Sequence, residues 1–122
     1  INTEVFARLG RLAQRFAARG GEATFILPPL IPGMEREMLA VEASRRCLAR
    51  TKAALDAWAR EYHVTIIDAG VSEVFSCKAE EFLDENHAWP ECHARILSRY
   101  QRDKSLRQVS AGLYRPAVEL RP

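Results

Sequence analysis

The chain has 122 residues, of which 48% are hydrophobic and 28% are charged. This composition matches average soluble globular domains, so it excludes a disordered or fibrous chain, and the length fits a single domain over residues 1–122. Eighteen basic residues against 16 acidic ones give a net charge of +2, too small to indicate a nucleic-acid partner. No apolar run has the roughly 18 to 20 residues of a membrane span, and no segment reads as a signal peptide.

Residues 3–19 predict an amphipathic helix, because Val5, Leu9, Leu12 and Phe16 recur at helical spacing with arginines between them. The chain begins with Ile rather than Met, so we expect it to be part of a longer precursor.

Two short apolar runs, 23–27 and 64–68, predict buried parallel strands. The stretch between them, 35–62, is rich in Ala, Arg, Glu and Leu and predicts one long helix. Its apolar side contains Val41, Leu48, Leu55 and Tyr62, with Cys47, Ala54 and Trp58 beside them. A strand, a helix and a strand form a βαβ crossover, which requires a parallel sheet covered by helices on both faces.

Residues 71–89 predict an ordered loop with one helical turn, and Pro90 opens a last helix that ends near Arg102. Its inward residues are expected to be Ile96, Leu97 and Tyr100. The core thus covers about residues 3–102, followed by a basic tail, 103–122. An edge strand in this tail stays open, with Leu113, Tyr114, Val118 and Leu120 as its candidate residues.

These elements predict an α/β fold, a three-layer α/β/α arrangement of flavodoxin-like type that is an incomplete part of a domain. A two-stranded sheet is only marginally stable by itself. We therefore expect the chain to associate with the remainder of its parent domain or with a second copy of itself.

The richest candidate site is Asp84-Glu85-Asn86-His87, which follows the second strand and precedes the last helix. Ligands of open parallel sheets bind beyond the carboxyl ends of the strands. Asp84 can accept the Nδ1 proton of His87 and leave Nε2 as a general base for a serine hydroxyl. In the alternative interpretation, Asp84 bonds nearby backbone N–H groups and His87 stacks on Trp89, so that both residues are structural.

In this order of elements, the Asp-x-x-His of Asp84 and His87 resembles the closing block of the SGNH (GDSL-type) hydrolases. The strand that ends in Pro28 and Pro29 and the strand at 64–68 are also similar to that family, over about residues 1–102. The nearest branches are the DltD-like and alginate O-acetylation-type envelope proteins. The resemblance implies an esterase or acyltransferase acting on acyl esters of cell-envelope polymers, with a periplasmic or extracytoplasmic location.

The sequence departs from that family in three places. It has no Gly-Asp-Ser nucleophile turn, it lacks the oxyanion-hole Gly and Asn blocks, and Cys92 stands where the family often has glycine. The resemblance therefore implies a carboxy-terminal part that supplies Asp84 and His87 to a serine outside this chain and is inactive alone. The alternative function is a noncatalytic module that binds a polysaccharide or a partner protein. Trp89 is the candidate for stacking on a sugar.

Three further interpretations concern the same loop. Ser72 in Gly-Val-Ser-Glu-Val would precede Asp84 and His87 in the α/β-hydrolase order, but the closing glycine is missing. A zinc site from Cys77, His87, Cys92 and His93 matches no familiar spacing, so we expect no metal and no cofactor. A disulfide between Cys77 and Cys92 is favoured instead, since it would close the loop that carries the Asp-His pair.

Four residues outside the loop have structural interpretations. Cys47 and Trp58 are expected in the core, and His63 is expected to cap the end of the long helix. Asp68, at the carboxyl end of the second strand, either caps the next turn or lines the cleft, and we favour the turn.

Overall fold

The computed structural model describes residues 2–117 and has an α/β fold with a three-stranded parallel sheet. The strands are β1 (Thr24–Leu27), β2 (Thr65–Asp68) and β3 (Gly112–Tyr114), in the order β1-β2-β3. Thr24 is paired with Thr65 and Thr65 with Gly112, and all strands run in the same direction. The sheet predicted from the sequence is therefore extended by one strand from the tail.

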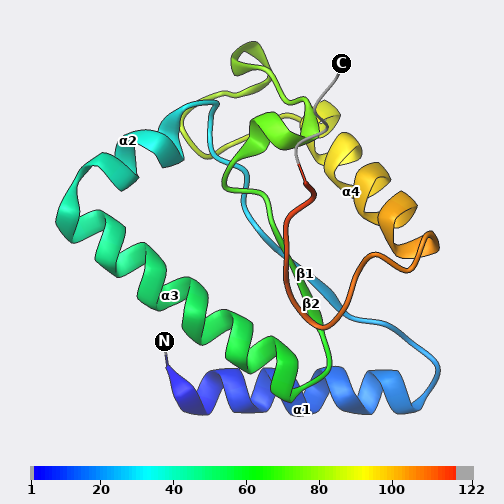
Figure 1. Ribbon diagram of the computed structural model, residues 1–122. Helices are drawn as coiled ribbons and strands as arrows, with labels where there is room; N and C mark the ends of the chain where they lie inside the picture. Colours follow the sequence, from blue (N-terminus) through cyan, green and yellow to red (C-terminus); the bar gives the residue numbers. More distant parts are fainter. Residues whose placement is uncertain (1, 118–122) are drawn as a thin grey trace.

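The helices are α1 (Thr3–Ala18), α2 (Met34–Ala40), α3 (Glu42–Glu61) and α4 (Pro90–Ser105). In Figure 1, α4 lies on one side of the strands and α3 on the other, while α1 crosses near the strands' amino ends. Short 3-10 turns, η1 (Ser72–Phe75) and η2 (Ala79–Glu81), form much of the connection between β2 and α4. Among residues 2–117, no helix is both long enough and apolar enough to cross a bilayer.

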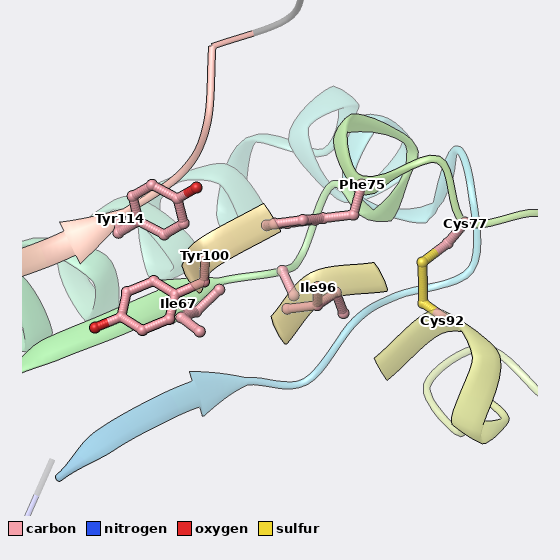
Figure 2. Close-up of a cluster of buried hydrophobic side chains, with 8 residues drawn as sticks. Ile67, Phe75, Cys77, Cys92, Ile96, Tyr100 and Tyr114 are labelled. Carbon is pink, nitrogen blue, oxygen red and sulfur yellow. A yellow bond between two sulfur atoms is a disulfide. The ribbon is translucent and has the colours of Figure 1, made fainter. Parts of the chain in front are cut away.

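Alternate residues of β2 pack into two hydrophobic clusters, one on each face of the sheet, as expected for a strand covered on both faces. Ile66 packs in a cluster with Trp58 of α3 and Ala13 of α1. Ile67 packs on the other face with α4, in the cluster drawn in Figure 2 with Phe75, Ile96, Tyr100 and Tyr114. The expectation that Trp58 is a core residue is confirmed, since only 8% of it is exposed.

The long helix predicted over 35–62 is wrong in one respect, because the chain breaks at Val41. This residue has φ −97° and ψ 120°, an extended conformation that separates α2 from α3. Only the C-terminal part of α3 buries side chains, so Val41 is 56% exposed and Cys47 is exposed rather than in the core. Glu35, in the first turn of α2, is nevertheless buried.

Two further predictions concern the carboxyl-terminal part of the chain. Ile96 and Tyr100 of α4 are buried as predicted, but Leu97 is 44% exposed and does not point inward. Leu113 and Tyr114 lie in β3 and answer the open question of an edge strand. The other two candidates, Val118 and Leu120, lie outside the described residues.

Candidate functional site

The loop that carries Asp84 and His87 folds as a small hairpin over the carboxyl edge of the sheet. Phe82 and Ala88 form an antiparallel bridge, and the backbone N–H of Leu83 donates to the carbonyl of His87 at 2.9 Å. The N–H of Trp89 donates to the carbonyl of Glu81 at 2.7 Å. Side chains alternate along such a hairpin, and Phe82 and Ala88 pack inward on the α4 core.

Leu83, His87 and Trp89 therefore share the outward face of this hairpin. Leu83 is 75% exposed, Trp89 is 53% exposed, and the side chain of His87 is 70% exposed. The structure thus places Asp84, His87 and Trp89 in one short, exposed segment.

The imidazole of His87 is held by the carboxylate of Asp84. Nδ1 lies 2.7 Å from Oδ1 and 2.8 Å from Oδ2. The backbone N–H groups of Asn86 and His87 also donate to Oδ1, at 3.1 and 3.0 Å. The bond from Asn86, the bond from the imidazole and the attraction of its charge hold the pKa of Asp84 below its usual range.

An ionised carboxylate only accepts hydrogen bonds, so Nδ1 of His87 carries a proton and donates it. In the neutral imidazole the lone pair then belongs to Nε2. Among residues 2–117 no group bonds to Nε2, and the ring edge faces solvent. The arrangement can accept a proton from a ligand or from a hydroxyl that approaches from outside.

Other bonds anchor the hairpin to the rest of the fold. The backbone N–H of Ile31, in the loop after β1, donates to the carbonyl of Glu85 at 2.8 Å. At its base, Cys77 and Cys92 form a disulfide with their Cα atoms 5.2 Å apart, shown in Figure 2 beside Phe75 and Ile96. Glu81 also pairs with Arg95 of α4. The hairpin that carries the Asp-His pair is therefore joined to the loop after β1 on one side and to α4 on the other.

Ser72 is not positioned as a nucleophile. It is fully buried at the start of η1, and its hydroxyl donates to the carbonyl of Leu30 at 2.5 Å. The α/β-hydrolase interpretation is wrong for this reason, since a nucleophile elbow presents its hydroxyl to the substrate.

The four-residue zinc interpretation is also wrong, because the disulfide occupies both cysteine sulfurs. Glu81 is the carboxylate near the two sulfurs, within 4.8 Å, while His87 faces Asp84 and His93 faces the carbonyl of Trp89 at 3.3 Å.

A second polar cluster lies at the same edge of the sheet, and the sequence interpretation missed it. We name it the ionic quartet: Glu35, Lys52, Asp68 and Arg115. Lys52 Nζ lies 2.7 Å from Glu35 and 2.9 Å from Asp68, and Arg115 lies 2.9 Å from each of the same two carboxylates. Glu35 and Asp68 are each 5% exposed.

Burial raises the pKa of Asp68, but the hydrogen bond from Lys52 and the charges of Arg115 and Lys52 outweigh this effect and hold the pKa below its usual range. Asp68 also accepts a hydrogen bond from the N–H of Gly70 at 3.2 Å, so the turn-capping role favoured above is confirmed. Asp68 has a second role as a member of the quartet. The quartet joins α2, α3, β2 and the residue after β3. The signal in the sequence was the charged residue at the end of an apolar strand.

The expected cap at His63 takes another form. His63 has φ 55°, and its backbone N–H donates to the carbonyl of Arg60 at 3.3 Å, so the backbone rather than the imidazole serves the end of α3.

Comparison of the chain with known protein families, with curated proteins and with solved structures found no match.

Proposed function

We propose that this chain provides the general-base half of a serine esterase or acyltransferase of SGNH type, acting on acyl esters of cell-envelope polymers in the periplasm or another extracytoplasmic space. The observation that supports it best is the contact of His87 Nδ1 with Asp84, which leaves Nε2 without a partner among residues 2–117, on an exposed side chain at the carboxyl edge of a parallel sheet. The disulfide agrees with an oxidising compartment.

In this mechanism a serine outside residues 1–122 attacks the ester carbonyl while Nε2 of His87 takes the hydroxyl proton. Asp84 stabilises the imidazolium that forms. His87 then gives the proton to the departing alcohol, and an acyl-serine results. Water or a polymer hydroxyl attacks this ester, again losing its proton to Nε2, and the serine leaves with that proton. Trp89 and Leu83 lie on the same outward face of the hairpin as His87, and Trp89 offers a ring face for a sugar.

The test is labelling of the full-length protein with a fluorophosphonate probe, which phosphonylates an activated serine. We expect His87→Ala to lower the labelling rate by roughly 10²- to 10⁴-fold, the range that general-base catalysis contributes. Asp84→Asn should lower it as well, because the amide no longer stabilises the imidazolium. The matched control is His63→Asn, at the opposite edge of the sheet, where asparagine tolerates the positive φ.

A noncatalytic polysaccharide-binding module is the second candidate function. It is favoured by the two bonds from backbone N–H groups to Asp84, which give this carboxylate a structural role in its turn. A folded, full-length protein that takes up no probe would contradict the catalytic proposal and support this one. Equal labelling of the wild type and His87→Ala would also contradict the catalytic proposal, since the serine would then be activated without this histidine.

A further inference from the structure

A cavity with basic walls lies between η1 and α4, and neither member of the Asp84–His87 pair lines it. Its volume is about 450 Å³, within the range of roughly 300 to 1,000 Å³ that small-molecule sites occupy. No acidic side chain of residues 2–117 lines it. We name it the arginine cavity. Its polar walls consist of three arginines and two serines: Arg95, Ser98, Arg99 and Arg102 of α4 and Ser76 at the end of η1.

The arginines line one cavity because of their spacing on α4. Arg95, Arg99 and Arg102 are separated by four and then three residues, so they project from the same face of the helix. Ser98 follows Arg95 by three residues and precedes Arg102 by four, which places its hydroxyl in the same row. The row therefore presents three guanidinium groups and a hydroxyl, all of them hydrogen-bond donors, along two turns of one helix.

Carboxylates from outside the cavity hold these guanidinium groups in position. Arg95 pairs with Glu81, and Nε of Arg99 donates to Asp103 at 3.0 Å. Nε of Arg102 lies 3.8 Å from the same aspartate, which is buried. A guanidinium has five N–H donors in a rigid plane, so a carboxylate partner fixes its orientation and does not exclude a further acceptor. The arginine cavity is thus pre-organised for an anion.

The number of donors favours a phosphate over a carboxylate as that anion. A carboxylate has one charge and two oxygens, which a single arginine satisfies in bidentate fashion. A phosphate monoester has a charge of about −1.5 to −2 at pH 7 and three acceptor oxygens, so several guanidinium and hydroxyl groups bond to it at once. Nucleic acid fits poorly, because the net charge of the chain is only +2. Val74 and Phe75 complete the lining and offer apolar contact to the organic part of the ester.

We propose that the arginine cavity binds the phosphate group of a small, soluble phosphate monoester. The three arginines neutralise its charge, and the two serine hydroxyls donate to its oxygens. The inference goes beyond the proposed function and does not depend on it, because neither Asp84 nor His87 lines the cavity.

The experiment is equilibrium dialysis of the full-length protein against radiolabelled inorganic phosphate, at constant ionic strength and about pH 8, where the probe is a dianion like the ester. We expect saturable binding of one phosphate that glycerol 3-phosphate displaces. Arg102→Gln should raise the Kd at least roughly tenfold, because one charge-assisted hydrogen bond is lost. The side chain of Arg102 is 55% exposed, so thermal unfolding should change little. The matched control is Arg11→Gln, an exposed arginine on α1 outside the cavity, which should keep the Kd of the wild type.

Ser98→Ala provides a second variant, which decides the matter should Arg102→Gln fail to fold. This exposed serine contributes one neutral hydrogen bond, so its loss should raise the Kd roughly fivefold. The absence of saturable phosphate binding would overturn the proposal, as would a wild-type Kd in folded Arg102→Gln and Ser98→Ala. Displacement by acetate at the same concentration as glycerol 3-phosphate would overturn the choice of phosphate. Sedimentation with phosphatidic acid vesicles in the absence of phosphate binding would overturn the choice of a soluble ligand.

The outcome is separate from that of the fluorophosphonate test. His87→Ala should bind phosphate as the wild type does, because its side chain does not line the cavity. A labelled serine in a protein that binds no phosphate would overturn the arginine cavity and leave the catalytic proposal standing. Phosphate binding that depends on Arg102 in a protein without label would support the cavity and contradict the catalytic proposal.

Discussion

Two sets of charged side chains lie at the carboxyl edge of the same sheet, and they differ in almost every physical respect. In the ionic quartet, Glu35 and Asp68 are buried and each contacts two cations. The Asp84–His87 pair is exposed, and one ring nitrogen of His87 has no partner among residues 2–117. A fully partnered buried cluster holds elements together, whereas an exposed pair with an unused lone pair can exchange a proton with a ligand.

The largest effect is expected from breaking the quartet. Asp68→Asn removes one negative charge and leaves Lys52 and Arg115 with Glu35 alone in a buried site. Loss of one member of a buried ion pair costs about 3 to 5 kcal/mol, so we expect the free energy of unfolding to fall by this amount. Urea unfolding followed by far-UV circular dichroism measures it, with Asp84→Asn as the exposed control that should change the midpoint much less.

The same variant should alter acid stability. The pKa of Asp68 is lower in the folded chain than its ordinary value of 3.8, so its contribution is complete above pH 3.8 and is lost as the pH falls through the folded value. Below pH 4 the wild type should therefore lose stability more steeply than Asp68→Asn. Parallel curves for the two proteins would contradict the assignment of this charge to the native fold.

The contrast between the quartet and the Asp84–His87 pair also shows which features could be predicted from the sequence. The strands at 24–27 and 65–68 follow from apolar runs bounded by glycine and proline, and α1 and α4 follow from helical spacing and from Pro90. These are local signals. The contact between Asp84 and His87 is also local, because the two residues are three apart and a turn brings them together.

The quartet could not be predicted in this way, because its members are distant in the chain. Lys52 and Asp68 meet only after α3 has packed on β2, and Arg115 joins them after β3 has paired. The break at Val41 could not be predicted either, since local propensity favours one helix, whereas in the fold Val41 is extended and Glu35 of α2 pairs with Lys52 of α3. Tertiary packing outweighed the helical pattern there.

The next largest loss of stability is expected when the disulfide at the base of the hairpin is removed. The double variant Cys77→Ala/Cys92→Ala opens a disulfide that spans 15 residues, which in the chain-entropy interpretation lowers the free energy of unfolding by about 3 kcal/mol. The thermal midpoint measures this loss. Cys47→Ala is the control, because this cysteine is exposed and unpaired. Mass spectrometry of protein purified without reductant should find one free thiol, and three free thiols would contradict the pairing.

The smallest effect on stability is expected at Trp89, and it tests whether the exposed region serves a ligand. Trp89 is 53% exposed on the outward face of the hairpin, so Trp89→Ala should leave thermal unfolding almost unchanged, whereas Trp58→Ala in the core should cost about 3 to 5 kcal/mol. If a sugar ring stacks on Trp89, its loss removes roughly 1 kcal/mol of binding, which corresponds to a roughly fivefold higher KM for a polysaccharide ester in the full-length protein. The kcat should stay the same, because the stacked ring is remote from the bond that breaks. An unchanged KM would mean that no sugar ring stacks on Trp89. The acyl group rather than the polymer would then be the part of the substrate that this face contacts.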